Sequence, residues 1–280
     1  MTVLLLKLLL APALVVGSSL AGRRWGPPVA GMLVALPIVA GPILLITGIE
    51  HGAPFVARAA AAALLGLMSL ALFAAVYAWL SRWFGWVVTL AISWAVCLGA
   101  DLALSTVPVG PGWGLILVLA VASAAARLLP AVEPAGDRRP SWPWWDLPGR
   151  AVATAALVLM VTALATTVGP RLTGVLAPFP IATSVVAAFA QAQHGPGAAI
   201  GLLRGVPRGL LGFSVFCCLV AVLAEPAGTL PAFAVALTGT LVVQLLWRTA
   251  LNRRTTRRTG PTGPEPVRAD ATDPDTATTR

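Results

Sequence analysis

The sequence predicts an all-helical (all-α) polytopic membrane protein built from two homologous units. Three observations lead to this prediction. Of the 280 residues, 58% are hydrophobic and 10% are charged, whereas about a quarter of a soluble domain is charged. Uncharged stretches long enough to span a bilayer recur along the chain. Distinctive residues also return at a constant interval, as His51-Gly52 and His194-Gly195 do.

Nine stretches are apolar and long enough to be predicted as transmembrane helices. The fifth is the shortest, and Pro108, Gly110 and Pro111 separate it from the fourth. We include it because it carries no charge before Arg127, whose long side chain can extend to the interface. The nine predicted spans cover about residues 4–22, 27–48, 54–81, 84–105, 113–129, 150–168, 172–192, 198–223 and 228–250.

The segments outside these spans are predicted to form a linker and a tail. Residues 130–149 are rich in proline and tryptophan, which predicts a linker with its tryptophans at the level of the lipid headgroups. Thr, Arg, Pro, Gly and Asp dominate residues 251–280, so we expect a disordered basic tail, which can bind anionic lipids. The predicted membrane units are therefore residues 1–129 and residues 150–250.

A shift of 143 residues aligns the two units without a gap. Matches of Leu, Ala and Val would arise by chance in so apolar a chain, but matches of Pro, His and Gly pairs would not. The shift therefore predicts an internal repeat whose core copies cover residues 7–81 and 150–224, with the equivalent Gly66 and Gly209 at close helix contacts. Residues 1–22 resemble a signal peptide, but their counterpart lies in mid-chain, so we expect a retained transmembrane helix. The aligned pairs include Gly26-Pro27 with Gly169-Pro170, Pro37-Ile38 with Pro180-Ile181, and Phe73 with Phe216.

The positions of the basic residues predict how the chain is oriented. With nine spans, 16 of the 19 Lys and Arg residues fall on one side, which is cytoplasmic by the positive-inside rule. We therefore expect a protein of the inner (plasma) membrane with its N-terminus outside and its linker and C-terminus in the cytoplasm. Five spans separate the starts of the two copies, so the second copy is inverted. If residues 113–129 did not cross the membrane, eight spans would remain and the two copies would be parallel. The Lys and Arg residues would then divide 15 to 4 between the two sides, which is nearly as uneven, so their positions alone do not decide between the two arrangements.

The second span of each copy is interrupted by proline. Inverted repeats with helices broken at matching points are typical of secondary transporters, whose substrate sites lie at the breaks. Proline removes a backbone donor, and the freed carbonyl groups must be satisfied within protein or at a water-filled cavity. The alternative is that these prolines only kink the helices. We predict a substrate site formed by Pro37, Pro42, Pro178, Pro180, Thr183, Ser184 and Gln191.

Ionisable residues inside a membrane are costly and point to function. We expect ion or proton binding at Asp101, Glu50, His51 and His194, and contacts to anions at Arg58 and Arg204. The alternative for most of them is a structural role near a span end, where long side chains reach the interface. For the two histidines that role is a turn, because the glycine that follows accepts positive φ. Inverted copies would place the two histidines on opposite sides of the membrane, so we expect that they do not bind a metal ion together.

Motifs for several enzyme classes are missing from the sequence. It has no Walker loop, no HExxH and no GxSxG, and no soluble domain long enough to hold a nucleotide. The cysteines, Cys97, Cys217 and Cys218, lie in apolar segments without the spacing of a zinc site. We therefore expect no enzyme activity, no cofactor and no nucleic-acid partner. The sequence favours a secondary transporter or permease for a small solute, and the alternative is a non-transporting membrane scaffold or accessory subunit.

Two runs in the second copy carry a resemblance to known proteins. GPRLTGVLAPFPI and QHGPGAAIGLLRG, with the fainter copies GPPVAGMLVALPI and EHGAPF, resemble a group of duplicated bacterial integral membrane proteins with no assigned activity. The resemblance implies two homologous membrane units and no particular functional residues. The inverted-repeat plan is also similar to that of the drug and metabolite transporter superfamily, which implies a solute carrier, although this chain lacks a tenth span.

Overall fold

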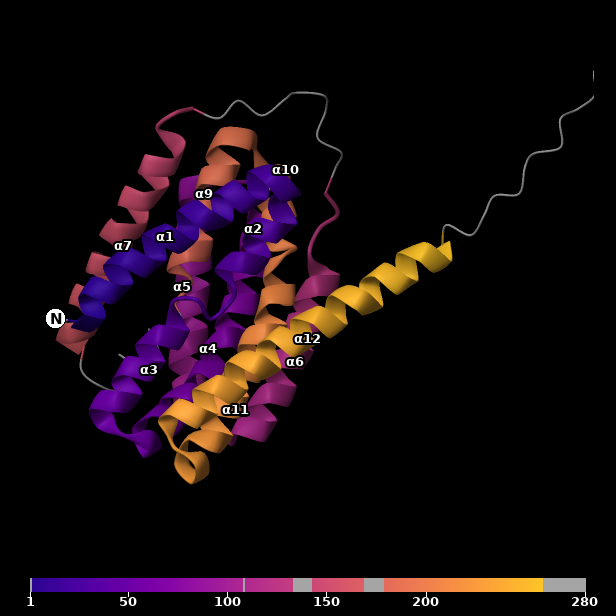
Figure 1. The fold of residues 1–280 in the computed structure, drawn as a ribbon. Coiled ribbons are helices and arrows are strands. Elements are labelled where there is room, and N and C mark those ends of the chain that lie inside the picture. Colours follow the sequence, from indigo (N-terminus) through magenta and orange to yellow (C-terminus); the bar gives the residue numbers. More distant parts are fainter. Residues whose placement is uncertain (1, 108, 133–142, 169–178, 259–280) are drawn as a thin grey trace, which may run out of the picture. The chain divides into compact units, whose positions relative to one another are not determined.

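The computed structural model describes residues 2–107, 109–132, 143–168 and 179–258, and gives the backbone alone for residues 2–4, 7, 47, 162–168 and 245–258. Within these ranges all the regular structure is helical. The helices are α1 (Thr2–Trp25), α2 (Pro27–Val34), α3 (Ala40–His51), α4 (Ala53–Leu80), α5 (Trp86–Ser105), α6 (Pro111–Leu128), α7 (Asp146–Val168), α9 (Ile181–His194), α10 (Pro196–Leu203), α11 (Val206–Ala227) and α12 (Thr229–Arg258) (Figure 1).

Long apolar helices identify a membrane protein. Among the described residues, α4, α5, α6 and the stretch Pro196–Ala227, which holds α10 and α11, are long and apolar enough to cross a bilayer. The fifth predicted span, which was the shortest, corresponds to α6 and belongs to this group. Helices α2, α3 and α9 have 8, 12 and 14 residues, so none of them reaches the roughly 20 residues that a single crossing needs.

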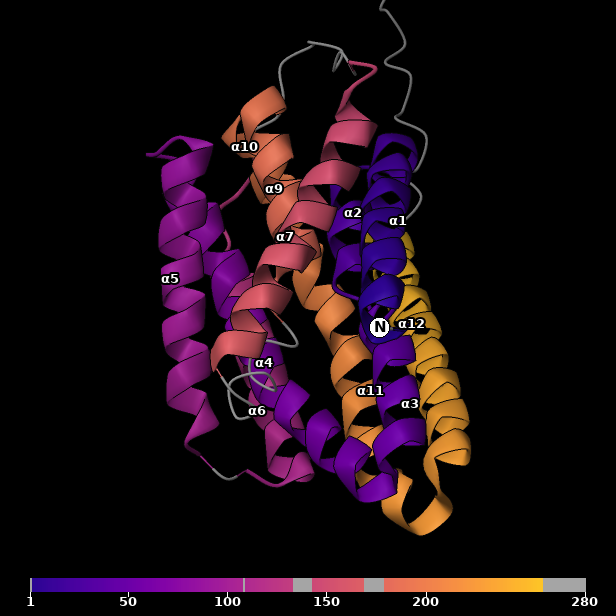
Figure 2. The same ribbon diagram turned by 90° about the vertical axis from the view of Figure 1, so that its left-hand side faces the viewer.

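Residues Met1–Val243 pack into one unit, in which α4 and α11 are the central helices, and Gln244–Arg280 form another. In the first unit α4 packs most extensively on α11, and it also contacts α3, α5 and α6 (Figures 1 and 2). Helix α1 packs along α7 and α2. The largest fully buried side chains lie mainly on the two central helices and include Leu64, Phe73, Tyr77, Leu210 and Phe216.

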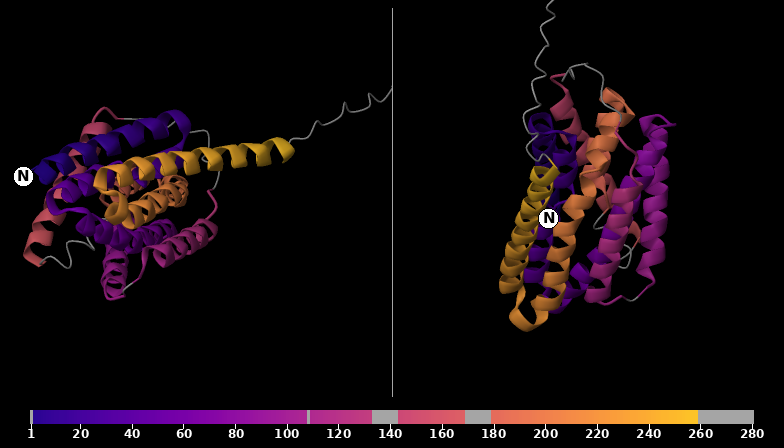
Figure 3. Two further views of the ribbon diagram at one scale, coloured as in Figure 1. Left: turned by 60° about the horizontal axis from the view of Figure 1, so that its bottom comes forward. Right: turned by 90° about the vertical axis from the view of Figure 1, so that its right-hand side faces the viewer.

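The start of α12, in yellow, lies beside α11, in orange, in Figure 3. The ring of Phe233 meets that of Phe216 edge to face, with centroids 5.6 Å apart. Thr240 Oγ1 donates to the carbonyl of Gly212 at 3.3 Å. Both contacts involve residues before Gln244, so this part of α12 belongs to the first unit.

The interruption expected in the second span is confirmed. Helix α2 ends at Val34 and α3 begins at Ala40. Pro37 lies in the gap and has no N–H, and its carbonyl accepts from the amide of Gly41 at 2.8 Å, which starts the next helix. Pro42 falls in the first turn of α3, where a missing N–H is tolerated.

A second interruption, not predicted, divides the span expected at residues 198–223. Helix α10 ends at Leu203 and α11 begins at Val206. The amide of Gly205 donates to the carbonyl of Leu202 at 2.9 Å, a bond across three residues that tightens the chain. Pro207 then occupies the first turn of α11, where it suits a helix start rather than a helix interior.

Glycine allows α2 to cross α10 and α11 with the backbones in contact. A Cβ atom at Gly31 would fall on the carbonyl oxygen of Leu202, and one at Gly205 would fall on that of Pro28. A Cβ atom at Gly209 would meet the carbonyl of Met32 and the side chain of Ala35, as expected for a close helix contact. The crossing therefore depends on residues without side chains.

Two boundaries differ from those expected. Helix α7 begins at Asp146, inside the predicted linker, because an acidic residue and Pro148 suit a first helical turn and Arg150 lies one turn further on. Helix α12 continues to Arg258, beyond the predicted end at residue 250, and Leu and Arg favour such a continuation. Residues 251–258, which were expected in the tail, therefore lie in α12, and residues 259–280 lie outside the described ranges.

Candidate functional site

A cavity of about 130 Å³ lies between the gap that separates α2 from α3 and the beginning of α9. One wall is the gap between α2 and α3, and another is the beginning of α9 with Phe179 and Pro180 before it. Side chains of α1, α4, α7 and α11 complete the lining, among them Leu14, Leu70 and Phe213. Segments from both predicted copies therefore surround one space.

The lining residues come in pairs from the two predicted copies. Four pairs separated by 143 positions contribute both members to the cavity wall. Positions that the predicted 143-residue repeat makes equivalent therefore line the same cavity. The pairs are Leu36 with Phe179, Val39 with Ala182, Ala40 with Thr183, and Leu70 with Phe213.

Only part of the predicted substrate site lines this cavity. Pro180 and Thr183 belong to its wall, and Pro37 is buried in the gap that borders it. Pro42 is half-buried and does not line the cavity, and Pro178 lies outside the described residues.

Ser184 and Gln191 are buried but point elsewhere. Ser184 Oγ accepts a hydrogen bond from Trp94 Nε1 of α5 at 2.8 Å. Gln191 Nε2 donates to the carbonyl of Phe84 at 2.8 Å, beyond the end of α4. Thr183 lines the cavity, whereas Ser184, about 100° further around the helix, faces Trp94 of α5. Ser184 and Gln191 therefore do not line this cavity together with Pro180.

Ser184 instead lines a larger groove of about 370 Å³ between α5, α7 and α9. Its walls include the aromatic side chains of Trp86, Trp94, Trp145 and Phe189. Helix α9 contributes to this groove but α2 and α3 do not, and no two of its described lining residues are 143 positions apart. The smaller cavity is therefore the one that matches the predicted site.

The chemistry of the small cavity is almost wholly apolar. Among the described residues that line it, Thr183 is the only one with a polar side chain. The first turns of α3 and α9 also border it, through Ala40 and through Ile181 and Ala182. The first amides of a helix lack acceptors within the helix and carry a positive partial charge. The cavity therefore suits a small, uncharged and largely apolar solute that carries a hydrogen-bond acceptor.

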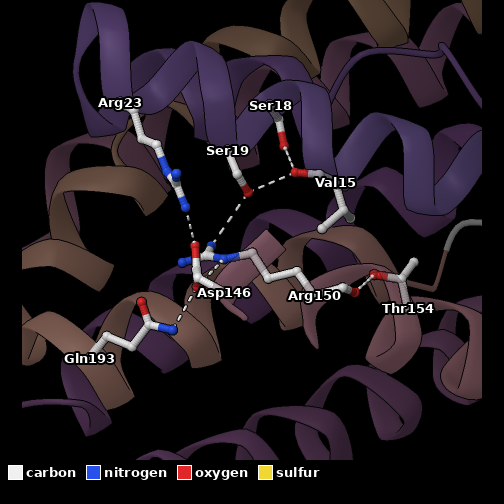
Figure 4. Close-up of polar contacts among 8 residues, drawn as sticks. All are labelled: Val15, Ser18, Ser19, Arg23, Asp146, Arg150, Thr154 and Gln193. Atoms are coloured by element: carbon white, nitrogen blue, oxygen red, sulfur yellow. Dashed lines mark hydrogen bonds and ion pairs between the residues drawn. The ribbon is translucent and has the colours of Figure 1, made fainter. Parts of the chain in front are cut away.

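A buried cluster of charges joins α1, α7 and α9 at one end of the bundle (Figure 4). The carboxylate of Asp146 is fully buried and accepts from Arg23 Nη2 at 2.6 Å and from Arg150 Nε at 2.8 Å. Gln193 Nε2 of α9 donates to the same carboxylate at 2.6 Å. Arg150 also donates to Ser19 Oγ of α1 at 3.4 Å. One carboxylate thus fixes three helices that line the cavity.

Burial and hydrogen bonding act in opposite directions on Asp146. Burial alone would raise the pKa of the carboxyl group, but the hydrogen bonds from Arg150, Gln193 and Arg23 and the charge of Arg150 outweigh it. The pKa of Asp146 therefore lies below its ordinary value, and the group is ionised at neutral pH. The sequence contained a signal for this pair, because opposite charges four residues apart meet on a helix, but the Trp- and Pro-rich context favoured a linker.

Each histidine ends a helix, and the glycine turn expected after it is confirmed. His51 closes α3 and His194 closes α9, and the following Gly52 and Gly195 have φ of 85° and 81°. The two turns lie at opposite ends of the bundle, since α3 ends at the bottom and α9 at the top of Figures 1 and 2. The ring of His51 stacks on Phe55 with centroids 4.8 Å apart. The histidines therefore do not share a site.

The positions of the two turns predict a labelling pattern. In a variant without native cysteines, His51→Cys and His194→Cys should react with a membrane-impermeant thiol reagent from opposite sides of sealed vesicles. A cysteine at Leu98, which is exposed on α5 within a candidate span, should react from neither side. Labelling of both turn positions from the same side would contradict the inverted arrangement.

The remaining candidate residues lie away from the cavity. Asp101 is buried on α5 with 3% of its surface exposed. Glu50 and Arg58 are exposed near the turn between α3 and α4. Arg204 is exposed in the gap between α10 and α11, and its Nη2 donates to the carbonyl of Leu129 at 3.4 Å. None of the four belongs to the described lining of the cavity, so the candidate ion contacts form no single site with it.

Comparison with family models, with curated proteins and with solved structures finds no match for this chain.

Proposed function

We propose that this protein is a secondary transporter or permease that carries a small, uncharged and largely apolar solute through the cavity between the α2–α3 gap and the beginning of α9. One observation carries the proposal: four pairs of equivalent residues face one cavity at the gap before α3 and the start of α9. Substrate sites of transporters built from inverted repeats lie at such a place.

The proposal includes nine crossings and inverted copies. In it, α2 with α3 and α10 with α11 each cross as a pair of shorter helices. In inverted copies, equivalent turns lie at opposite ends of the helix bundle. The turns after His51 and His194 lie at opposite ends. Inverted copies also pack equivalent helices on each other, and α1 packs on α7 while α4 packs on α11. The positions of the two turns at opposite ends of the bundle support inversion over a parallel arrangement.

In this mechanism the solute reaches the cavity from one side at a time, as the two copies rock against each other. The cluster around Asp146 joins α1, α7 and α9, which also contribute Leu14, Val158 and Thr183 to the cavity wall. Opening the cavity towards that end separates these helices and breaks the cluster. The cluster therefore acts as the closed gate at its end of the molecule.

The test is whether Thr183 can be reached from both sides. We expect Thr183→Cys, in a variant without native cysteines, to react with a small impermeant thiol reagent added to either side of proteoliposomes. Val186→Cys is the matched control, because Val186 lies on the same helix with 1% of its surface exposed and does not line the cavity. This control should not react from either side.

Solute movement gives the second measurement. Proteoliposomes should take up some member of a panel of small neutral solutes, and filling the cavity by Ala182→Trp should abolish that uptake. Leu98→Trp introduces the same side chain on the exposed face of α5 and should leave uptake unchanged. If Thr183→Cys reacts from neither side and no solute moves, the transporter proposal fails and the scaffold alternative replaces it.

A further inference from the structure

The buried face of α5 is polar along its length. All four buried residues of this helix are polar or weakly polar and are spaced four apart: Thr89, Ser93, Cys97 and Asp101. Residues four apart share one side of a helix. Large apolar side chains such as Val87, Ile92 and Leu102 occupy the exposed side. In an apolar helix that is a candidate membrane span, this face is turned towards the protein, where intramembrane polar groups are usually functional.

Asp101 is the only ionisable carboxyl on this face, and its neighbours are neutral. Cys97 Sγ lies 4.0 Å from Oδ2. Ser69 of α4 faces the carboxyl group, yet neither Ser69 Oγ nor Asp101 Oδ1 has a hydrogen-bond partner within the described residues. Among the described residues, no basic side chain forms an ion pair with Asp101, whereas Asp146 pairs with Arg23 and Arg150.

Other titratable groups on the helices packed against α5 lie further away. Helix α4 carries Tyr77, eight residues from Ser69 and therefore about 12 Å further along the helix. Helix α9 carries His194 at its end, next to Gln193, which lines the groove with Trp86 at the opposite end of α5. Cys97 on α5 itself is thus the nearest titratable group to Asp101.

These neighbours suit a proton better than a metal cation. An ionised carboxylate without a cation is costly in an apolar interior, whereas a protonated carboxyl group is neutral and gains an O–H donor. Ser69 Oγ can accept from that donor. Hard metal cations need a shell of several oxygen ligands, and the described neighbours offer one hydroxyl and one thiol beside the carboxyl group.

The polar face leads from Asp101 to the end of the bundle that holds the Asp146 cluster. Ser93 Oγ donates to the carbonyl of Thr89 at 2.7 Å, and Thr89 Oγ1 donates to that of Phe84 at 3.3 Å. Gln191 of α9 also donates to the Phe84 carbonyl. Successive members of the face are about 6 Å apart along the helix axis, and hydroxyl groups can both donate and accept a proton.

We infer that Asp101 is a proton-binding site and that the polar face of α5 is its route to the end of the bundle at Phe84. Ser69 precedes Leu70, which lines the cavity, so the carboxyl group and the cavity both border α4. Protonation of Asp101 can therefore affect the cavity wall through α4 alone. The coupling of this proton to solute movement rests on the proposed function, whereas the proton site itself does not.

Infrared spectroscopy of the full-length protein in lipid tests the proton site. We expect a carbonyl band of a protonated carboxylic acid at neutral pH, which disappears in Asp101→Asn. Glu225→Gln is the matched control, because Glu225 is exposed at the end of α11 and should contribute no such band. Loss of the band when sodium chloride replaces choline chloride at constant pH would instead identify a metal-cation site. A wild-type protein without the band would overturn the inference.

Two further measurements test separately the proton route along α5 and the coupling of the proton to solute movement. Thr89→Val and Ser93→Ala should keep the band but slow its exchange in deuterated buffer, and unchanged exchange would overturn the route. In proteoliposomes, a proton gradient should accelerate solute uptake by the wild type and not by Asp101→Asn. If the band is present and no solute moves, the proton site stands and the transporter proposal fails. If solute moves equally in both proteins, transport stands and coupling through Asp101 fails.

Discussion

Replacing Asp146 with alanine should destabilise the protein by about 3–5 kcal/mol, because removal of one partner leaves a buried charge uncompensated. Arg150 has only 4% of its side chain exposed and would lose its carboxylate, while Arg23 and Gln193 would lose their acceptor. Chemical unfolding of the purified protein in detergent measures the loss. Glu225→Ala, which removes an exposed carboxylate, should change stability little.

The charge and the shape of Asp146 can be separated. Asp146→Asn keeps the size of the side chain, so we expect it to lose most of the same stability. Since the folded pKa of Asp146 lies below its unfolded value of about 3.9, its contribution is present above that pH and is lost as the pH falls towards the lowered pKa. The asparagine variant should lack this acid-dependent loss. If Asp146→Ala costs no more than Glu225→Ala, the cluster does not hold the three helices together.

Replacing Gly205 with alanine should destabilise the protein by about 3 kcal/mol, at the upper end of the usual effect of overpacking. The added Cβ atom would fall on the carbonyl oxygen of Pro28 and lie 2.8 Å from the amide nitrogen of Met32. Both are backbone atoms, so no side chain can move aside, and α2 must separate from α11. Unfolding in detergent, together with the yield of monodisperse protein, measures the effect.

Two glycines within helices provide the control for this prediction. Gly17 of α1 and Gly99 of α5 have no atom within 4 Å of an added Cβ atom. Alanine at either position should leave stability unchanged or raise it by up to about 1 kcal/mol, because alanine favours helix more than glycine does. If Gly205→Ala behaves like Gly99→Ala, then the backbones of α2 and α11 are not in contact.

The helices and the first interruption were predictable because their causes are local. Apolar runs of sufficient length predict helices in lipid, and Pro37 predicts a break wherever the chain folds. The 143-residue shift further predicted that the break and the start of α9 correspond, and the structure brings both to one cavity. The interruption near Gly205 was not predictable in this way, because proline and glycine are also common within continuous transmembrane helices.

The details of the candidate site depend on packing, which a single sequence does not specify. Thr183 and Ser184 are adjacent and chemically alike, and the rotation of α9 decides that Thr183 faces the cavity while Ser184 meets Trp94. Asp146 was assigned to a linker because tryptophans and prolines surround it. Its role depends on Arg23, which is distant in sequence and reaches it only after α1 has packed on α7.

The glycine crossing of α2 with α10 and α11 also affects how the molecule can move. Interlocked side chains must change rotamer when two helices shift, but at Gly31, Gly205 and Gly209 the facing surfaces are backbone and small groups. Such a contact holds α2 against α10 and α11 but offers little resistance when the helices rotate relative to each other. It can therefore serve as a fulcrum for that rotation. Displacements about a fulcrum grow with distance from it. Spin labels beside Gly205 should therefore report nearly constant distances during turnover, while labels at the two histidine turns report the largest changes.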